Sequence, residues 1–77
     1  MNYCVKMNLN SVESVKEFYN ASNRLIGDVF IQSGRYIIDG KSVMGIFSLD
    51  LSKPVHVYFE IEPSKEDFEI FRQWIIE

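Results

Sequence analysis

The clearest signal in the chain is an alternation of apolar and polar side chains in two segments. In residues 3–9 and 55–62 every second residue is apolar, and most of the residues between them are polar. A period of two is typical of a strand with one buried face. We therefore expect a strand in each segment, with Val57 and Phe59 on the buried side of the second.

Helical spacing predicts a first helix over about residues 11–24. Its expected buried stripe is Val12, Val15, Phe18, Tyr19, Ser22 and Leu25. Asn10 and Ser11 are both candidate N-caps, and Glu13 lies three residues after Asn10, as in a capping box.

The last helix is expected to begin after the N-cap Ser64, with Asp67 three residues further on. The side chains that we expect it to bury are Phe68, Phe71, Trp74 and Ile75.

The middle of the chain predicts a hairpin and a short helix. Residues 29–31 and 35–39 read as strands joined by a turn at Ser33-Gly34. Residues 42–49 fit a strand or a helix by pattern alone. Ser42 as an N-cap and the spacing of the apolar residues after it favour a helix of about two turns. The resulting order, β-α-β-β-α-β-α over residues 1–77, predicts one α+β domain with three helices on one face of an antiparallel sheet.

Composition narrows the classes of function. The net charge of −3 disfavours nucleic acid and anionic membranes as partners. There is one cysteine, so no internal disulfide can form, and a chain without a signal-peptide pattern fits a cytoplasmic setting. Cys4 lies in an apolar stretch, and we expect it to be a buried, inert thiol. One histidine and one cysteine do not make a metal site.

One stretch resembles the HPr family, the small phosphocarriers of the bacterial sugar phosphotransferase system. Residues 39–49 read DGKSVMGIFSL, close to the family's Lys-Ser-Ile-Met-Gly pattern at the start of its short second helix. The element order also matches along nearly the whole chain. The resemblance implies an open-faced β-sandwich with sheet order 1-4-2-3.

The family's active site is a histidine at the start of the first helix, followed by an arginine that receives the phosphate. When Phe18 and Asp28 are set on their family counterparts, the histidine position falls on Ser11 and the arginine position on Glu13. The one histidine, His56, lies in a predicted strand, on its polar side. The resemblance therefore implies a degenerate member without the catalytic histidine, and we expect no enzyme activity and no cofactor.

Ser42 matches the serine that a dedicated kinase phosphorylates in part of the family. A plain N-cap role explains the same residue equally well. The helix after Ser42 is too apolar to bury all of its side chains on one side. The resemblance implies that partners dock there, so Val43, Met44 and Phe47 are candidate contacts. The alternative is that all of these residues belong to the core.

The expected function is a regulatory or partner-binding module related to the phosphotransferase system. Its partners would be proteins of that system, a transcriptional regulator or a serine kinase, and a homodimer is possible. Two alternatives stay open: a true phosphocarrier with an atypical acceptor, and an unrelated structural or oligomerisation domain that shares the fold.

Overall fold

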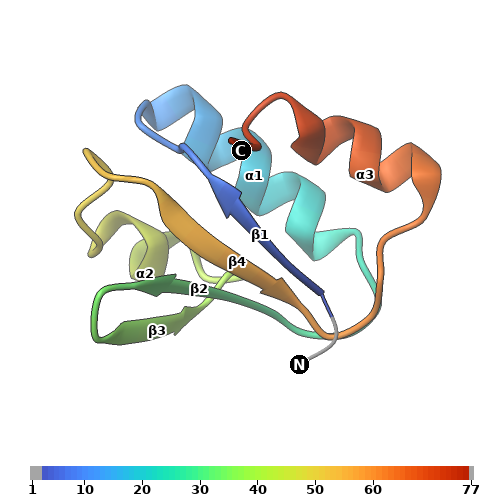
Figure 1. Cartoon of the computed structure of the whole chain (residues 1–77), viewed down its shortest axis with the longest axis horizontal. Helices are drawn as coiled ribbons and strands as arrows, with labels where there is room; N and C mark the ends of the chain where they lie inside the picture. The colour runs from blue at the N-terminus through green and yellow to red at the C-terminus, as the bar shows by residue number, and fades with distance from the viewer. Residues whose placement is uncertain (1–2, 77) are drawn as a thin grey trace.

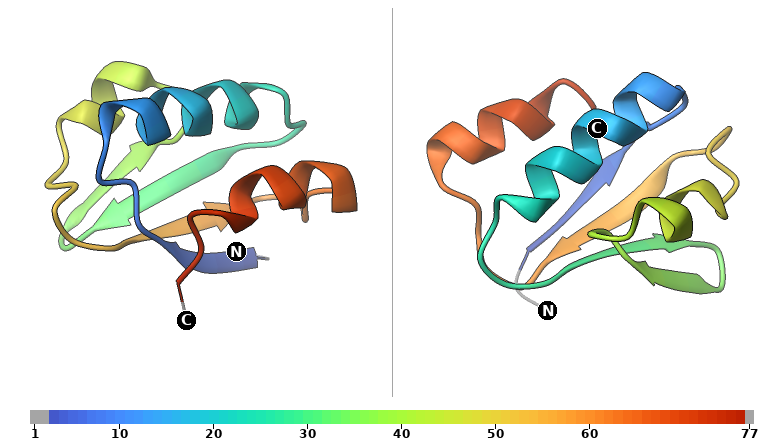
Figure 2. Two further views of the ribbon diagram at one scale, coloured as in Figure 1. Left: turned by 90° about the horizontal axis from the view of Figure 1, so that it is seen from above. Right: turned by 180° about the vertical axis from the view of Figure 1, so that it is seen from behind.

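The computed structural model describes residues 3–76, which form one antiparallel sheet covered by helices (Figure 1). The elements are β1 (Tyr3–Met7), α1 (Val12–Asn23), β2 (Val29–Ser33), β3 (Tyr36–Asp39), α2 (Val43–Phe47), β4 (Val55–Phe59) and α3 (Lys65–Arg72). The strand order is β1-β4-β2-β3. The three helices lie on one face of the sheet, as Figure 2 shows from above. The predicted α+β class, element order and sheet order are confirmed.

Strand register divides the sheet residues between two faces. Val5 lies opposite Val57, which lies opposite Ile31, so these three side chains form one row toward the helices. Their neighbours along each strand point the other way. The side chains on the helix-free side, called the open face below, are Cys4, Lys6, Phe30, Gln32, Ile37, Asp39, His56 and Tyr58.

Four aromatic rings form the centre of the core. The ring of Phe71 on α3 contacts Phe59 on β4 at a centroid distance of 5.2 Å and Phe18 on α1 at 5.6 Å. Trp74 completes the group, 6.0 Å from Phe71 and 6.1 Å from Phe18. All four pairs meet edge to face, a geometry worth about 0.5–1.5 kcal/mol per pair beyond the area buried. The cluster thereby links α1, α3 and the sheet.

Serine side chains begin all three helices. Ser11 caps α1 and Ser64 caps α3, each by accepting a hydrogen bond from the backbone N–H three residues later. The predicted capping box between Asn10 and Glu13 is wrong. Its place is taken by Ser11 and Ser14, because the Ser14 hydroxyl accepts from the Ser11 N–H while Ser11 accepts from the Ser14 N–H.

The end of the chain departs from the predicted helix. α3 stops at Arg72, so Trp74 and Ile75 lie beyond it, although Trp74 is buried as expected. The backbone then turns back along β1: the Asn8 N–H donates to the Trp74 carbonyl at 2.8 Å, and the Ile76 N–H donates to the Lys6 carbonyl at 2.9 Å. These bonds to a distant strand replace the next helical turn.

Several expected core positions are more exposed than predicted. Val12 begins α1 and is 60% exposed, whereas Ser14 and Val15 in the same turn are buried. Phe68 is only half-buried, and Ile61 is exposed beyond the end of β4. Phe18, Val29, Val57 and Phe59 are buried as expected.

Cys4 is exposed, so the prediction of a buried thiol is wrong. In β1 the side chains of Cys4 and Lys6 point to the same side, the open face of the sheet, and Cys4 lies opposite Tyr58 on β4. Its place in the alternation decides its exposure, whereas its apolar neighbours point to the helices.

The hairpin between β2 and β3 turns at Gly34, whose φ is +59°. That left-handed conformation suits glycine. The predicted hairpin is confirmed, but its turn lies at Gly34 and Arg35 rather than at Ser33-Gly34, because Ser33 pairs with Tyr36 at the end of β2. Both strands differ slightly from their predicted bounds: β2 continues to Ser33, and β3 starts at Tyr36.

We predict that Phe71→Ala lowers the free energy of unfolding by about 3–5 kcal/mol, because it empties the centre of the aromatic cluster. Urea denaturation followed by Trp74 fluorescence measures the loss. Ile26→Ala is the control: Ile26 is 86% exposed and its truncation should change stability by less than about 0.5 kcal/mol. Equal effects of the two changes would contradict the assignment of the core.

We predict that Ser42→Ala destabilises the protein by about 1 kcal/mol, because the Gly45 N–H loses its acceptor. Ser42→Asp is the matched comparison, since its carboxylate can accept the same bond and aspartate caps as well as serine. Thermal denaturation should therefore lower the Tm of the alanine variant and leave that of the aspartate variant near wild type. A similar loss in both would mean that the hydroxyl does something other than cap α2.

Candidate functional site

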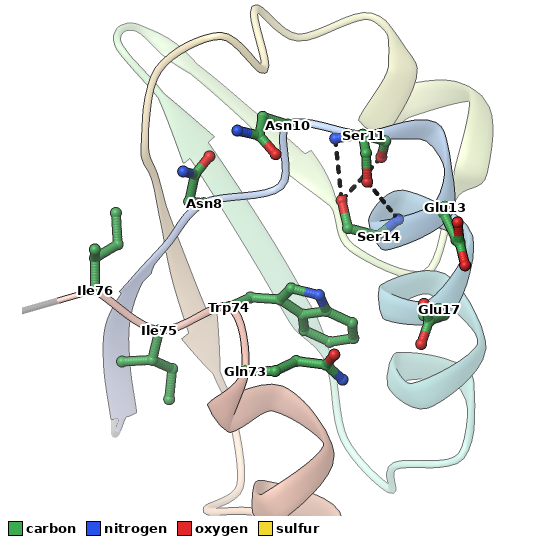
Figure 3. Close-up of a pocket in the computed structure, with 10 residues that line it drawn as sticks. All are labelled: Asn8, Asn10, Ser11, Glu13, Ser14, Glu17, Gln73, Trp74, Ile75 and Ile76. Atoms are coloured by element: carbon green, nitrogen blue, oxygen red, sulfur yellow. Dashed lines mark hydrogen bonds between the residues drawn. The ribbon is translucent and has the colours of Figure 1, made fainter.

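The sequence singled out two places, the start of α1 and the helix α2. The start of α1 forms a shallow pocket of about 450 Å³ together with the end of β1 and the chain after α3 (Figure 3). The residues that line it are Asn8, Asn10, Ser11, Glu13, Ser14, Glu17, Gln73, Trp74, Ile75 and Ile76.

The hydroxyls in this pocket are committed to the helix cap. Ser11 Oγ accepts from the Ser14 N–H at 3.0 Å, and Ser14 Oγ donates to the Ser11 carbonyl at 2.8 Å (Figure 3). An incoming group would have to compete with these bonds for the serine oxygens.

The charge of the pocket is negative. Glu13 and Glu17 are its charged lining residues, and the lining includes no lysine, arginine or histidine. The N-terminus of a helix ordinarily attracts anions through its free N–H groups and its dipole. Here two carboxylates oppose that attraction, so the pocket is poorly suited to a phosphoryl group.

His56 lies on the opposite side of the sheet from α1. It is exposed on the open face in the middle of β4, between Lys6 of β1 and Gln32 of β2. The sheet separates its imidazole from the Ser11 pocket, so the fold does not bring the histidine to the start of α1. Its expected place on the polar side of a strand is confirmed.

α2 presents part of its apolar surface to solvent. Ile46 is fully buried, and Val43 is half-buried. Met44 is 79% exposed and Phe47 43% exposed. The alternative in which every apolar residue of α2 belongs to the core is therefore wrong, and α2 carries the exposed apolar side chains that its composition predicted.

Backbone and side-chain bonds hold the start of α2 in place. Ser42 is the N-cap, as predicted: its Oγ accepts from the Gly45 N–H at 3.2 Å, and its own N–H donates to the Asp39 carbonyl. Lys41 Nζ donates to the Leu25 carbonyl at 2.9 Å and ties this turn to the segment after α1.

Gly45 lies beside the N-cap of its own helix. A Cβ at position 45 would sit 3.3 Å from Ser42 Oγ, which is a tight contact, and 3.4 Å from Ile38 Cδ1, which is an ordinary one. The glycine therefore leaves room for the Ser42 hydroxyl at the start of α2.

Residues 3–76 show neither a metal site nor a membrane-spanning helix. No group of three or more histidine, cysteine, aspartate or glutamate side chains there is arranged to hold a metal ion. Within the same residues, no helix has the length and apolar character needed to cross a membrane.

The sequence did not indicate that Gln73 and Trp74 border the Ser11 pocket. They come from the far end of the chain, and only the return of the backbone along β1 brings them there. The helical spacing of the apolar residues near the C-terminus did not predict that the backbone after α3 would run back along β1.

Comparisons with known proteins bear on the fold. No family model matches the chain, and no curated protein matches it. Solved structures do. HPr-C-His from Thermoanaerobacter tengcongensis superposes with a TM-score of 0.74 at 17% identity, over 92% of this chain and 88% of that one. A phosphocarrier protein HPr from Bacillus anthracis str. Ames superposes with a TM-score of 0.69 at 22% identity, over 96% and 94%. The chain therefore has the fold of HPr.

Proposed function

We propose that this protein is an HPr-like regulatory or partner-binding module related to the sugar phosphotransferase system, and that it does not relay phosphoryl groups. The observation that carries the proposal is the chemistry at the start of α1. The position expected to hold the phosphorylated histidine is Ser11, its hydroxyl is part of a helix cap, and two glutamates replace a cationic surrounding.

Electrostatics disfavours transfer at this position. Two unit charges 4 Å apart interact by about 1 kcal/mol in water and about 4 kcal/mol near a protein surface. An arginine would lower the energy of a phosphoryl dianion by such an amount, whereas Glu13 raises it. The difference between the two side chains opposes both the binding of a phosphoryl donor and the stability of a phosphorylated product.

The second part of the proposal is that partners dock on α2. Val43, Met44 and Phe47 form a small apolar surface beside a serine cap. Exposed apolar side chains grouped on one element are typical of protein–protein contacts. The partner classes that fit are proteins of the phosphotransferase system, a transcriptional regulator or a serine kinase, all in the cytoplasm.

We further propose Ser42 as a site of regulatory phosphorylation. A phosphate there adds about −1.5 to −2 charge at pH 7 at the start of a helix, where anions are tolerated. Its oxygens would stand next to Val43 and the exposed Met44. The modification would leave the fold intact and change recognition: a partner rich in arginine gains charge-assisted hydrogen bonds, and one that reads only apolar surface loses affinity.

We predict that phosphoenolpyruvate and the first enzyme of the phosphotransferase system leave the protein unmodified, because no imidazole stands at the start of α1. Intact-mass spectrometry after incubation measures this. Ser11→His alone should gain little, since Glu13 remains, whereas Ser11→His with Glu13→Arg should gain measurable acid-labile phosphate. Acid-labile phosphate on His56 of the wild type would overturn the proposal in favour of an atypical phosphocarrier.

We predict that Met44→Glu with Phe47→Glu abolishes binding to a partner that the wild-type protein captures, while circular dichroism and Tm stay near wild type. Both side chains are exposed, so carboxylates there cost little stability but are poorly accommodated in an apolar contact. The control is Val12→Glu with Ile26→Glu, which changes two other exposed apolar residues in the same way. Full binding by the α2 variant, or equal loss in the control, would remove α2 as the docking surface.

A further inference from the structure

The open face carries two rows of four side chains, one from each strand. In register across the sheet, the first row is Cys4, Tyr58, Phe30 and Asp39, and the second is Lys6, His56, Gln32 and Ile37. None of the helices covers this face, because all three pack on the other side (Figure 2).

The middle of the open face is apolar. Phe30, Gln32, Ile37 and Tyr58 enclose a shallow hollow of about 370 Å³. Ile37 is 62% exposed, while Phe30 and Tyr58 are half-buried. The Tyr58 hydroxyl donates to Gln32 Oε1 at 2.7 Å, so the polar groups there are partly paired and the hollow presents ring and aliphatic carbon.

The two ends of the open face carry opposite charge. At the end where β4 begins lie Lys6 and, in the β2–β3 turn, Arg35. At the end where β2 begins lie Asp28, Asp39 and Glu60. A charge of the other sign also lies near each end. Asp50, with Lys53 near it, precedes β4 at the basic end, and Lys41, whose ammonium donates to the Leu25 carbonyl and keeps its charge, follows β3 at the acidic end.

We propose that the open face binds the open face of a second copy of this chain. A two-fold axis between the two sheets, perpendicular to the strands, sets β1 over β1 and runs the strands antiparallel. The acidic end of each copy then lies over the basic end of the other, and the apolar hollows meet in the middle. A face with opposite charges at its ends is complementary to itself in this arrangement, which is the argument for a second copy as the occupant.

The area of the open face determines how strongly two copies can bind each other through it. Four strands about 4.8 Å apart and five residues at about 3.4 Å each give a face of roughly 19 Å by 17 Å. Covering it on two copies buries less than the roughly 1,200 Å² of a stable complex, so the dimer is weak and depends on concentration. The face is separate from α2 and from the Ser11 pocket, so this inference stands whether or not the proposed function does.

Sedimentation equilibrium from micromolar to millimolar protein tests the inference. The weight-average mass of the wild type should rise from 9.0 kDa toward twice that value. Ile37→Glu, which puts a carboxylate in the hollow, should stay monomeric at every concentration, while Met44→Glu on α2 should associate like the wild type. A wild type that stays at the monomer mass at millimolar concentration would overturn the proposal.

Charge reversal tests the orientation. A variant with Lys6→Glu and Arg35→Glu has two acidic ends, and one with Asp28→Lys and Asp39→Lys has two basic ends. Each alone should lose self-association, and an equimolar mixture should recover it as a heterodimer. Association by either variant alone at wild-type strength would exclude the antiparallel stacking.

Asp39 Oδ1 also accepts a hydrogen bond from the Lys41 N–H, which Asp39→Lys removes. If the double variant with Asp28→Lys and Asp39→Lys is less stable than the wild type, the single variant Asp28→Lys takes its place in the test.

An NMR dilution series of the wild-type protein tests the same contact without any substitution. The amide shifts of Phe30, Ile37 and Tyr58 should move with concentration and those of Met44 should not. Movement confined to α2 would assign any dimer to the other surface and refute the proposal.

Discussion

The contact of Phe71 with Phe59 and Phe18 is the interaction on which the rest of the structure depends. It joins the last helix to the central strand β4 and to α1, and each ring meets the next edge to face. A sheet of four short strands can be stable in water when helices cover one of its faces. Because all the large buried side chains are used on that side, the opposite face stays without a cover, and the surfaces left for function are the helix ends, α2 and the open face.

Local patterns were enough to predict the element order. Periodicity indicated β1, α1, β4 and α3, turn residues indicated the hairpin, and the N-cap Ser42 helped to decide in favour of a helix at α2. They failed where a distant backbone decides the local structure. Trp74 continues the helical stripe, yet its carbonyl accepts from the Asn8 N–H and the helix has already ended. Cys4 shows the opposite case: its alternation with Lys6 correctly places it on the solvent side, and its apolar neighbours gave the wrong interpretation.

The candidate sites could be predicted from the sequence only where their residues are neighbours in the chain. Ser42 and the apolar residues after it are contiguous, so an excess of apolar surface on a short helix could be recognised in advance, and the exposure of Met44 follows from it. The Ser11 pocket joins residues from both ends of the chain. Likewise, the open face becomes visible as a patterned surface only when strand register sets Tyr58 beside Phe30 and Gln32 beside Ile37.

The start of α1 separates what a fold needs from what phosphoryl transfer needs. The backbone at a helix start needs acceptors for its free N–H groups, and the Ser11–Ser14 pair provides them. Phosphoryl transfer needs in addition a nucleophile with a free lone pair and a cation to stabilise the developing charge. Capping alone does not prevent the second, since a hydroxyl that accepts one hydrogen bond keeps another lone pair. Charge opposes it here, because Glu13 has the wrong sign and the lining of the pocket includes no cation. The capped start of α1 therefore satisfies the backbone of the fold, while its two carboxylates oppose the charge that phosphoryl transfer would place there.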